Sequence, residues 1–284
     1  MSEVRSGYDR AIKAAEALRK EFTEEEVIST LEDISERTLY CYRKFASHGL
    51  QSLLMPESEG GYGCTYHDAG LVMEDLSYDY IGALPSLITT MHCIELIKLS
   101  SDENQKKKLL KRVLDTAEPL AFCLTEEEAG SDIGGIKCTA LKTKKDIRMR
   151  GRKTVVISST VAQLYLVFAT LSRSQGRAGI NVFAVEKDSE GLIIDEPYQL
   201  EGFQNSVIGP VEFHNAPLSD ENRLSREGVG YFMLIECLDK GRPLVAASCV
   251  GAAQKVMDII VQYTKKRSQF NKPLNYFQGI TFPL

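Results

Sequence analysis

Apolar residues recur at helical spacing through the first 117 positions of the chain. One amphipathic face is formed by Ile12, Ala15, Leu18 and Phe22, which step by three or four residues. Thr23, followed three residues later by Glu26, matches a capping box and predicts the start of a helical run over 27–45. Three further helices are predicted over 67–78, 84–99 and 104–114.

The hydrophobic period changes after position 118. Residues 147–157 begin as an alternation of apolar and charged side chains, which is typical of a half-buried strand. Other short segments are rich in β-branched and aromatic residues and are separated by turn residues. The pattern predicts an antiparallel β domain with strands over 120–124, 136–141, 147–157, 165–170, 180–185 and 206–213.

Helical spacing returns after Gly228. A continuous apolar stripe predicts a core-facing helix and consists of Val245, Cys249, Ala252, Val256, Ile259 and Tyr263. A further helix is predicted to start near Phe277. The chain is therefore expected to be α+β, with an N-terminal helical domain (1–117), a middle antiparallel β domain (118–220) and the start of a C-terminal helical bundle (221–284).

Composition and charge limit the possible partners and cellular location of the protein. A net charge of −5 argues against nucleic acid as the main partner. Seven scattered cysteines, without a C-x-x-C pair or metal-ligand spacing to the four histidines, indicate free thiols and a cytoplasmic, reducing environment. We expect no export signal and no membrane span, since no uninterrupted apolar run approaches the required ~20 residues. His48, His67 and His92 each stand alone, which favours structural or surface roles.

The stretch most suggestive of chemistry is LAFCLTEEEAGSDIGGIKCTA, residues 120–140. An apolar strand ends in Thr125 and leads into a turn of small residues that includes Gly130 and Ser131. Hydroxyls and main-chain N–H groups at such a turn can bind the edge of a flat polar ring, and small residues allow its close approach. An ordinary surface loop between strands is the alternative interpretation of the same residues.

This stretch resembles the "T-E-P-G-A-G-S-D" signature of the acyl-CoA dehydrogenase flavoprotein family. The resemblance continues in family order from about Met55 to the end of the chain. It is carried by Gly151-Arg152-Lys153, Val211-Glu212-Phe213, Asp239-Lys240-Gly241-Arg242, Arg267-Ser268-Gln269-Phe270 and Phe277-Gln278. It implies bound FAD and α,β-dehydrogenation of an acyl thioester, in which a carboxylate removes the α-proton while the β-hydrogen leaves as hydride.

The resemblance also implies roles for individual residues. Those expected along the flavin ring are Phe122, Leu124, Thr125, Gly130, Ser131, Val155, Val156 and Ile157. Those expected at the FAD diphosphate and adenine, commonly across a subunit interface, are Arg267, Ser268, Gln269, Phe270, Phe277 and Gln278. Those expected at the substrate are Ser131, Asp239 and Arg242. Each could instead be a solvated charge, a strand-end hydroxyl or, for Asp239 and Arg242, a surface pair on a helix.

The implied partners are an acyl-CoA or a carrier-protein acyl thioester, an electron-transferring flavoprotein or similar acceptor, and further subunits of the same or another kind. The chain departs from the family pattern at the positions Glu127-Glu128, Val155, Ile157, Gln204 and Gly241. A minority of members place the catalytic base at the position of Gly241, and most place it in a C-terminal bundle that extends beyond this chain. No residue of the chain can therefore be named as the base.

Three functions remain open. The chain is an acyl-CoA dehydrogenase-like polypeptide completed by further sequence, a non-catalytic remnant or regulatory subunit that pairs with an active homologue, or a relative that acts as an oxidase or monooxygenase. In each case, a helix with an apolar stripe and an incomplete bundle is expected to associate with other molecules.

Overall fold

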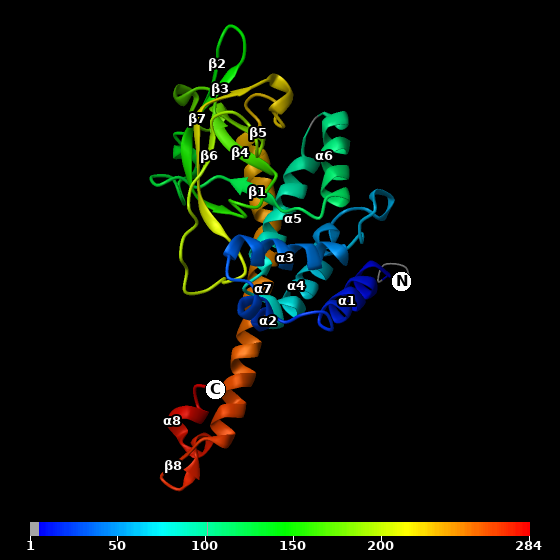
Figure 1. The fold of residues 1–284 in the computed structure, drawn as a ribbon, viewed down its shortest axis with the longest axis vertical. Helices are drawn as coiled ribbons and strands as arrows, with labels where there is room; N and C mark the ends of the chain where they lie inside the picture. Colours follow the sequence, from blue (N-terminus) through cyan, green and yellow to red (C-terminus); the bar gives the residue numbers. More distant parts are fainter. Residues whose placement is uncertain (1–5, 101) are drawn as a thin grey trace.

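The computed structural model describes residues 6–100 and 102–284 (Figure 1). A cluster of helices and a β domain lie side by side, and one long helix, α7, runs past both. The C-terminal segment folds back on the free end of α7, at the opposite end of the molecule from the β domain. The architecture confirms the predicted α+β class and the order of its parts.

The N-terminal region contains α1 (Ser6–Leu18), α2 (Glu24–Thr30), α3 (Ile34–Ser47), α4 (Tyr66–Tyr80), α5 (Leu84–Lys98) and α6 (Glu103–Asp115), with 3₁₀ turns at Leu50–Ser52 and Glu57–Glu59. The predicted capping box is present, because Glu26 N–H donates to Thr23 Oγ1 and Thr23 N–H to the Glu26 carboxylate. The single helix predicted over 27–45 is wrong. The chain leaves helical geometry at Leu31, and the Asp33 side chain caps a separate helix, α3.

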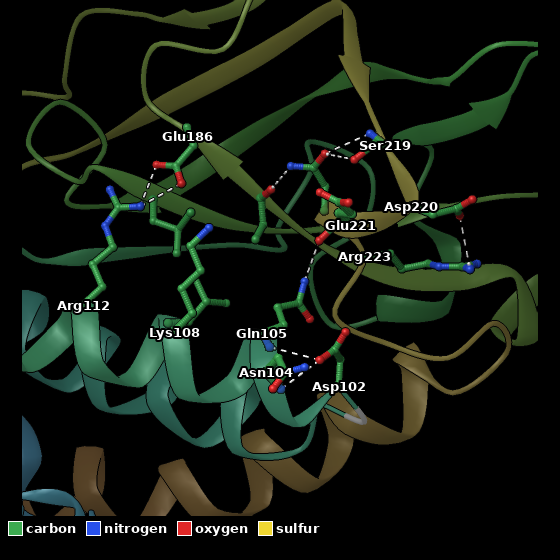
Figure 2. Close-up of a pocket in the computed structure, with 14 residues that line it drawn as sticks. Asp102, Asn104, Gln105, Lys108, Arg112, Glu186, Ser219, Asp220, Glu221 and Arg223 are labelled. Carbon is green, nitrogen blue, oxygen red and sulfur yellow. Dashed lines mark hydrogen bonds and ion pairs between the residues drawn. The ribbon is translucent and has the colours of Figure 1, made fainter.

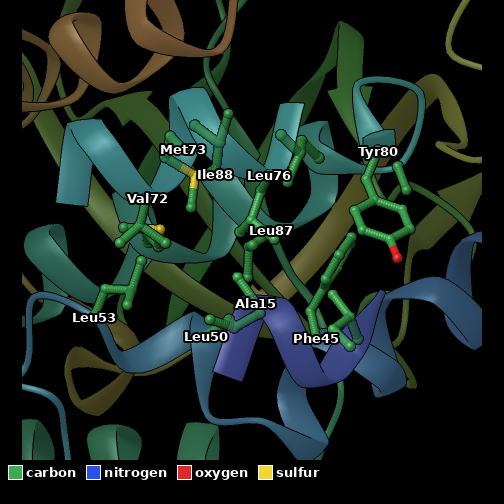
Figure 3. Close-up of a cluster of buried hydrophobic side chains, with 14 of the residues drawn as sticks. Ala15, Phe45, Leu50, Leu53, Val72, Met73, Leu76, Tyr80, Leu87 and Ile88 are labelled. Carbon is green, nitrogen blue, oxygen red and sulfur yellow. The ribbon is translucent and has the colours of Figure 1, made fainter. Parts of the chain in front are cut away.

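The core of this region is formed by α1, α3, α4 and α5 (Figure 3). Aromatic rings pack at one end of it, with the centroids of Phe22 and Tyr80 4.9 Å apart and those of Phe45 and Tyr80 5.8 Å apart. Helix α5 is buried on nearly every side, which explains its weak amphipathic pattern. It lies at the centre of the molecule and contacts both β1 and α7.

The β domain is a seven-stranded sheet in the order β1-β4-β2-β3-β7-β6, with β5 paired to β4. Its strands are β1 (Leu120–Cys123), β2 (Thr139–Lys142), β3 (Ile147–Ile157), β4 (Leu164–Thr170), β5 (Ile180–Glu186), β6 (Leu192–Ile194) and β7 (Ile208–Leu218), with 3₁₀ turns at Ile133–Gly135, Arg173–Gly179 and Asp220–Asn222. Most pairs are antiparallel as expected, but β4 pairs in parallel with β1 and with β2. Strand β6 was not predicted, since three residues are too short to show alternation.

Helix α7 (Gly230–Lys266) packs against α4 and α5 through a face that includes the small residues Gly241, Ser248 and Gly251. A Cβ atom added at Gly251 would lie 1.9 Å from the carbonyl oxygen of Glu74, so only glycine permits this approach. Beyond α7 the chain forms β8 (Ser268–Gln269), β9 (Lys272–Pro273), a 3₁₀ turn (Leu274–Tyr276) and α8 (Gln278–Thr281).

The apolar stripe predicted to face the core is instead on the surface of α7. Val245 is 45% exposed, Val256 55%, and Ile259 and Tyr263 58% each. The buried face comprises other residues, including Leu244, Ser248 and Gly251. The prediction that the stripe packs into the core is therefore wrong for these 284 residues. The stripe is instead exposed, as expected of a helix in an incomplete bundle.

By length and composition, α7 could also cross a membrane, and it is the one such helix in the described part of the chain. Two charged residues in its second half contact α4: Asp258 accepts a hydrogen bond from Tyr78 at 2.8 Å, and Lys255 Nζ lies 3.4 Å from Asp79. These polar contacts fit packing against α4 better than immersion in lipid.

Candidate functional site

The turn after β1 is a tight two-residue connection. Glu126 and Ala129 exchange main-chain hydrogen bonds of 3.1 and 3.2 Å, which leaves Glu127 and Glu128 exposed at the tip. The Glu128 carboxylate forms an ion pair with Lys137. One of the two carboxylates that depart from the family pattern is therefore compensated by a neighbouring cation.

The turn is attached directly to β3. Thr154 donates its main-chain N–H to the carbonyl oxygen of Thr125 at 2.9 Å, and the Lys153 ammonium donates to the carbonyl oxygen of Leu124 at 2.9 Å. Val155, the next residue of β3, leaves 48% of its surface exposed. The two stretches predicted to contact a flavin ring, which are about 30 positions apart in sequence, are thus neighbours in space.

Small residues leave open space beyond the turn. A Cβ atom added at Gly130 would meet nothing within 4 Å, and Ser131 is exposed. Within residues 6–100 and 102–284, no hydrogen bond engages the main-chain N–H of either residue. Two unused donors at an open turn can bind the polar edge of a ligand.

Beneath the turn lies a buried ion pair. The side chain of Lys153 is 0% exposed and that of Glu126 8% exposed, with Nζ and Oε1 2.7 Å apart. Neither residue was assigned a role from the sequence, because a lysine within a strand gives no sign that its side chain turns inward.

Aromatic rings pack together near the end of β1. The ring centroid of Phe122 lies 5.0 Å from that of Phe168 and 6.3 Å from that of His92. Burial lowers the pKa of His92, although the Gly241 main chain and the Glu95 carboxylate act in the opposite direction. His92 was expected to be a structural or surface residue, because no residue near it in sequence has metal-ligand spacing. The structure places its ring next to Phe122, which is one of the residues predicted to contact the flavin.

The predicted substrate residues Asp239 and Arg242 lie on the exposed face of α7. They form an i,i+3 ion pair with an N···O distance of 2.9 Å. A neighbouring cluster was missed by sequence reasoning: buried Glu95 accepts from the Tyr66 hydroxyl and pairs with Lys98 at 2.6 Å. Lys240 Nζ lies 3.9 Å from the same carboxylate, so α4, α5 and α7 share one polar contact.

The predicted diphosphate and adenine residues are not brought to this turn within one chain. They lie in the segment after α7, which contacts only the end of that helix (Figure 1). A helix of 37 residues is about 55 Å long. Phe270 is 88% exposed, and Phe277 lies in a local aromatic contact with it. Their joint use with the turn would require a second copy or another subunit, so this assignment stays a prediction.

The residues near the turn fit the edge of a flavin in three respects: free N–H donors, open space over Gly130, and an exposed apolar side chain at Val155. Two side chains fit less well, since Val156 is fully buried and Leu124 is 8% exposed. These two could contribute only main-chain atoms or a small part of their surface.

A cleft with a volume of ≈440 Å³ lies between α6 and the β domain (Figure 2). Arg112 donates two hydrogen bonds of 2.7 and 2.8 Å to the Glu186 carboxylate, and Gln105 donates to the carbonyl oxygen of Glu221 at 2.6 Å. These contacts join the helical region to the β domain. Because its charges are largely paired, this cleft is best described as an interdomain seam.

Comparison with family models assigns the whole architecture. Residues 12–117 match the acyl-CoA dehydrogenase N-terminal domain, 121–216 the middle domain and 227–284 the C-terminal domain. The fold is that of an acyl-CoA dehydrogenase-type flavoprotein.

Individual relatives agree. An acyl-CoA dehydrogenase of Bacillus subtilis (strain 168) is 31% identical over 257 residues, which cover 89% of this chain and 67% of the relative. A subunit of the caffeyl-CoA reductase–Etf complex of Acetobacterium woodii is 29% identical, with coverage of 95% and 73%. The structure of butyryl-CoA dehydrogenase from Megasphaera elsdenii superposes with a TM-score of 0.85 at 28% identity, covering 97% of this chain and 73% of that one. This chain belongs to the acyl-CoA dehydrogenase family.

Proposed function

We propose that this chain is the flavin-binding part of an FAD-dependent oxidoreductase that forms or reduces the α,β double bond of an acyl thioester. The observation that carries the proposal is the 2.9 Å hydrogen bond between Thr154 and Thr125, because it holds the Gly130–Ser131 turn beside the exposed Val155. The relatives named as acyl-CoA dehydrogenase and as a subunit of a caffeyl-CoA reductase–Etf complex support both directions of the reaction.

The residues of the chain supply binding and orientation. The free N–H groups of Gly130 and Ser131 would bind the polar edge of the ring, and Val155 would cover part of its face. Asp239 and Arg242 would contact the thioester substrate. Bound FAD would accept the hydride that leaves the β-carbon.

The proton-removing group is proposed to come from outside these 284 residues. Gly241 carries no side chain, and a Cβ atom there would lie 1.5 Å from Nε2 of His92. A longer residue at position 241 would therefore need His92 to move. This packing also favours the second candidate function, a non-catalytic subunit that pairs with an active homologue.

Partners follow from the same relatives. The Acetobacterium relative is named as part of an Etf complex, which supports an electron-transferring flavoprotein as the redox partner of this chain. The exposed stripe of α7 supports association with a second subunit. All seven cysteines are unpaired, which supports a cytoplasmic, reducing location.

The proposal is tested by purifying the chain with added FAD and recording its visible spectrum after removal of free flavin. Retained oxidised flavin that is bleached anaerobically by butyryl-CoA once a polypeptide carrying the remaining bundle helices is added would support the enzyme, because the proton-removing group is proposed to lie outside these residues. If flavin is retained but is bleached only when an active homologue is co-expressed, the result would support the non-catalytic subunit. No retained flavin under any pairing would contradict both.

Gly130→Ala sharpens this test. The added methyl group meets no atom of the protein, so stability should stay within about 0.5 kcal/mol of the parent. If a flavin edge approaches this turn, the FAD dissociation constant should rise at least about tenfold. Gly202→Ala is the matched control, because its Cβ would also meet nothing within 4 Å. Equal FAD affinity in both variants would place the ligand elsewhere.

A further inference from the structure

Lys153 and Glu126 form an unusually buried ion pair. Among the ion pairs in the described part of the chain, it is the one in which both side chains are less than a tenth exposed. Two of the three hydrogens of the ammonium group are used, one toward Glu126 Oε1 at 2.7 Å and one toward the carbonyl oxygen of Leu124 at 2.9 Å. The cation is therefore fixed at the base of the turn.

The Glu126 carboxylate ties further segments to the same point. Its Oε2 accepts the main-chain N–H of Lys137 at 2.6 Å, and its Oε1 accepts that of Cys138 at 3.1 Å. One carboxylate thus joins the turn after β1, the approach to β2 and the middle of β3. These are the two ends of the loop that carries Gly130 and Ser131, together with the strand that lies beside it.

This arrangement is poorly explained by stability alone. Burying two charges carries a desolvation cost that often matches or exceeds their attraction. A pair of apolar side chains at these positions would therefore stabilise the fold at least equally. The loop between residues 126 and 137 packs on the core through Ala129, Ile133 and Ile136, and its other residues, several of them small, offer few further side chains to pack. Directional hydrogen bonds at its two ends can define its shape where packing cannot.

We propose that Glu126 and Lys153 are positioning residues that fix the loop 125–138 in the shape that presents Gly130 and Ser131 to a ligand. The inference rests on the proposed flavin site for the identity of the ligand. The effect of the pair on the shape of the loop is independent of that ligand and can be measured without it.

The experiment compares the parent chain with Glu126→Gln, Lys153→Met and the double variant. Each single variant leaves a buried group without its partner and should lower the melting temperature. The double variant removes both charges and should melt within about 5 °C of the parent. Amide hydrogen exchange of the flavin-free chain is then followed by mass spectrometry, and FAD affinity is measured separately. A matched control neutralises the exposed pair Lys111–Asp115 by Lys111→Met and Asp115→Asn.

In the double variant, exchange over 125–138 should accelerate at least about tenfold while the core strands stay protected. Its FAD dissociation constant should rise at least about tenfold, and the control should match the parent in both measurements. Parental exchange over 125–138 in the double variant would overturn the proposal. If the double variant does not fold, the nearly isosteric Glu126→Gln decides in the same way. Failure of the parent to bind FAD would contradict the proposed function, while the exchange result would still judge the pair.

Discussion

His92 lies directly against Gly241, so that a Cβ atom added at Gly241 would come within 1.5 Å of Nε2 of His92. The two residues are brought together by the packing of α5 on α7, and the Cys237 thiol donates to the His92 carbonyl oxygen at 3.2 Å in the same contact. The imidazole thereby fills the space beside the position where some family members carry a catalytic carboxylate.

This burial makes stability depend on pH. The pKa of His92 is lowered in the folded chain, so the unfolded chain binds a proton more readily. The stability contribution is present above the unfolded value near 6.5 and is lost as pH falls through the folded pKa. We expect urea unfolding to show a loss between pH 7.5 and pH 5 that is smaller in His92→Gln. Glu95 and Lys240 are charged groups in the same region, so neither residue is mutated in this comparison. An equal loss in parent and variant would contradict the assignment.

Gly241→Ala should displace the His92 ring, because a side chain can rotate away whereas main chain cannot. The pKa of His92 should then move back toward its ordinary value as the ring gains contact with water. Nuclear magnetic resonance titration of the four imidazoles measures this, with Gly279→Ala, whose Cβ meets nothing within 4 Å, as the control. A His92 titration identical to that of the parent would mean that the ring has not moved.

Gly251→Ala should be more damaging. The new Cβ would lie 1.9 Å from the carbonyl oxygen of Glu74, which belongs to the main chain of α4 and cannot move alone. Overpacking should cost about 3 kcal/mol, against a gain of about 1 kcal/mol in helix propensity. We expect a net loss of about 2 kcal/mol in the free energy of unfolding, measured by urea denaturation. No loss would show that α4 and α7 can separate freely.

In the monomer, thiol labelling should single out Cys249, which is the exposed one of the seven cysteines. Burial raises the pKa of Cys64 and Cys138 to about 11 and that of Cys41 and Cys237 to about 12. At pH 8 only about one in a thousand of the Cys64 and Cys138 thiols would be ionised. A maleimide reagent should therefore modify one thiol rapidly in the folded chain and all seven in urea. Rapid loss of two or more thiols without denaturant would contradict this burial.

Self-association should depend on the exposed stripe of α7. Replacing Val256 and Ile259 by glutamate places charge on a surface that is more than half exposed and should not disturb the fold. We expect the parent to elute as an oligomer in sizing chromatography and the double variant to shift toward the monomer. Gln262→Glu, on the same helix, controls for added charge. A monomeric parent chain would contradict the prediction.

Local sequence rules predicted most of the elements. The Thr23–Glu26 capping box and helices α4, α5 and α6 depend on residues within a few positions of each other, so their signals survive in the sequence. The break at residues 31–33 was missed because the apolar pattern continues across it. Parallel pairing of β1 with β4 joins residues more than 40 positions apart and has no local signature.

The candidate site, too, was predicted from the sequence only in part. Small residues and hydroxyls in the stretch 120–140, together with motifs in family order, were sufficient to indicate the family and the turn. The neighbours of that turn were not predictable, since Lys153 in a strand and His92 in a helix look like ordinary surface or structural residues.

By itself, the sequence determined the succession of helices and strands, the family, and the turn of small residues, because these depend on spacing along the chain. Only the tertiary structure decided that Lys153 is buried under that turn, that His92 abuts Gly241, and that the apolar stripe of α7 faces outward. Burial and contact arise from segments that are distant in sequence, and a side chain acquires them only when the elements pack.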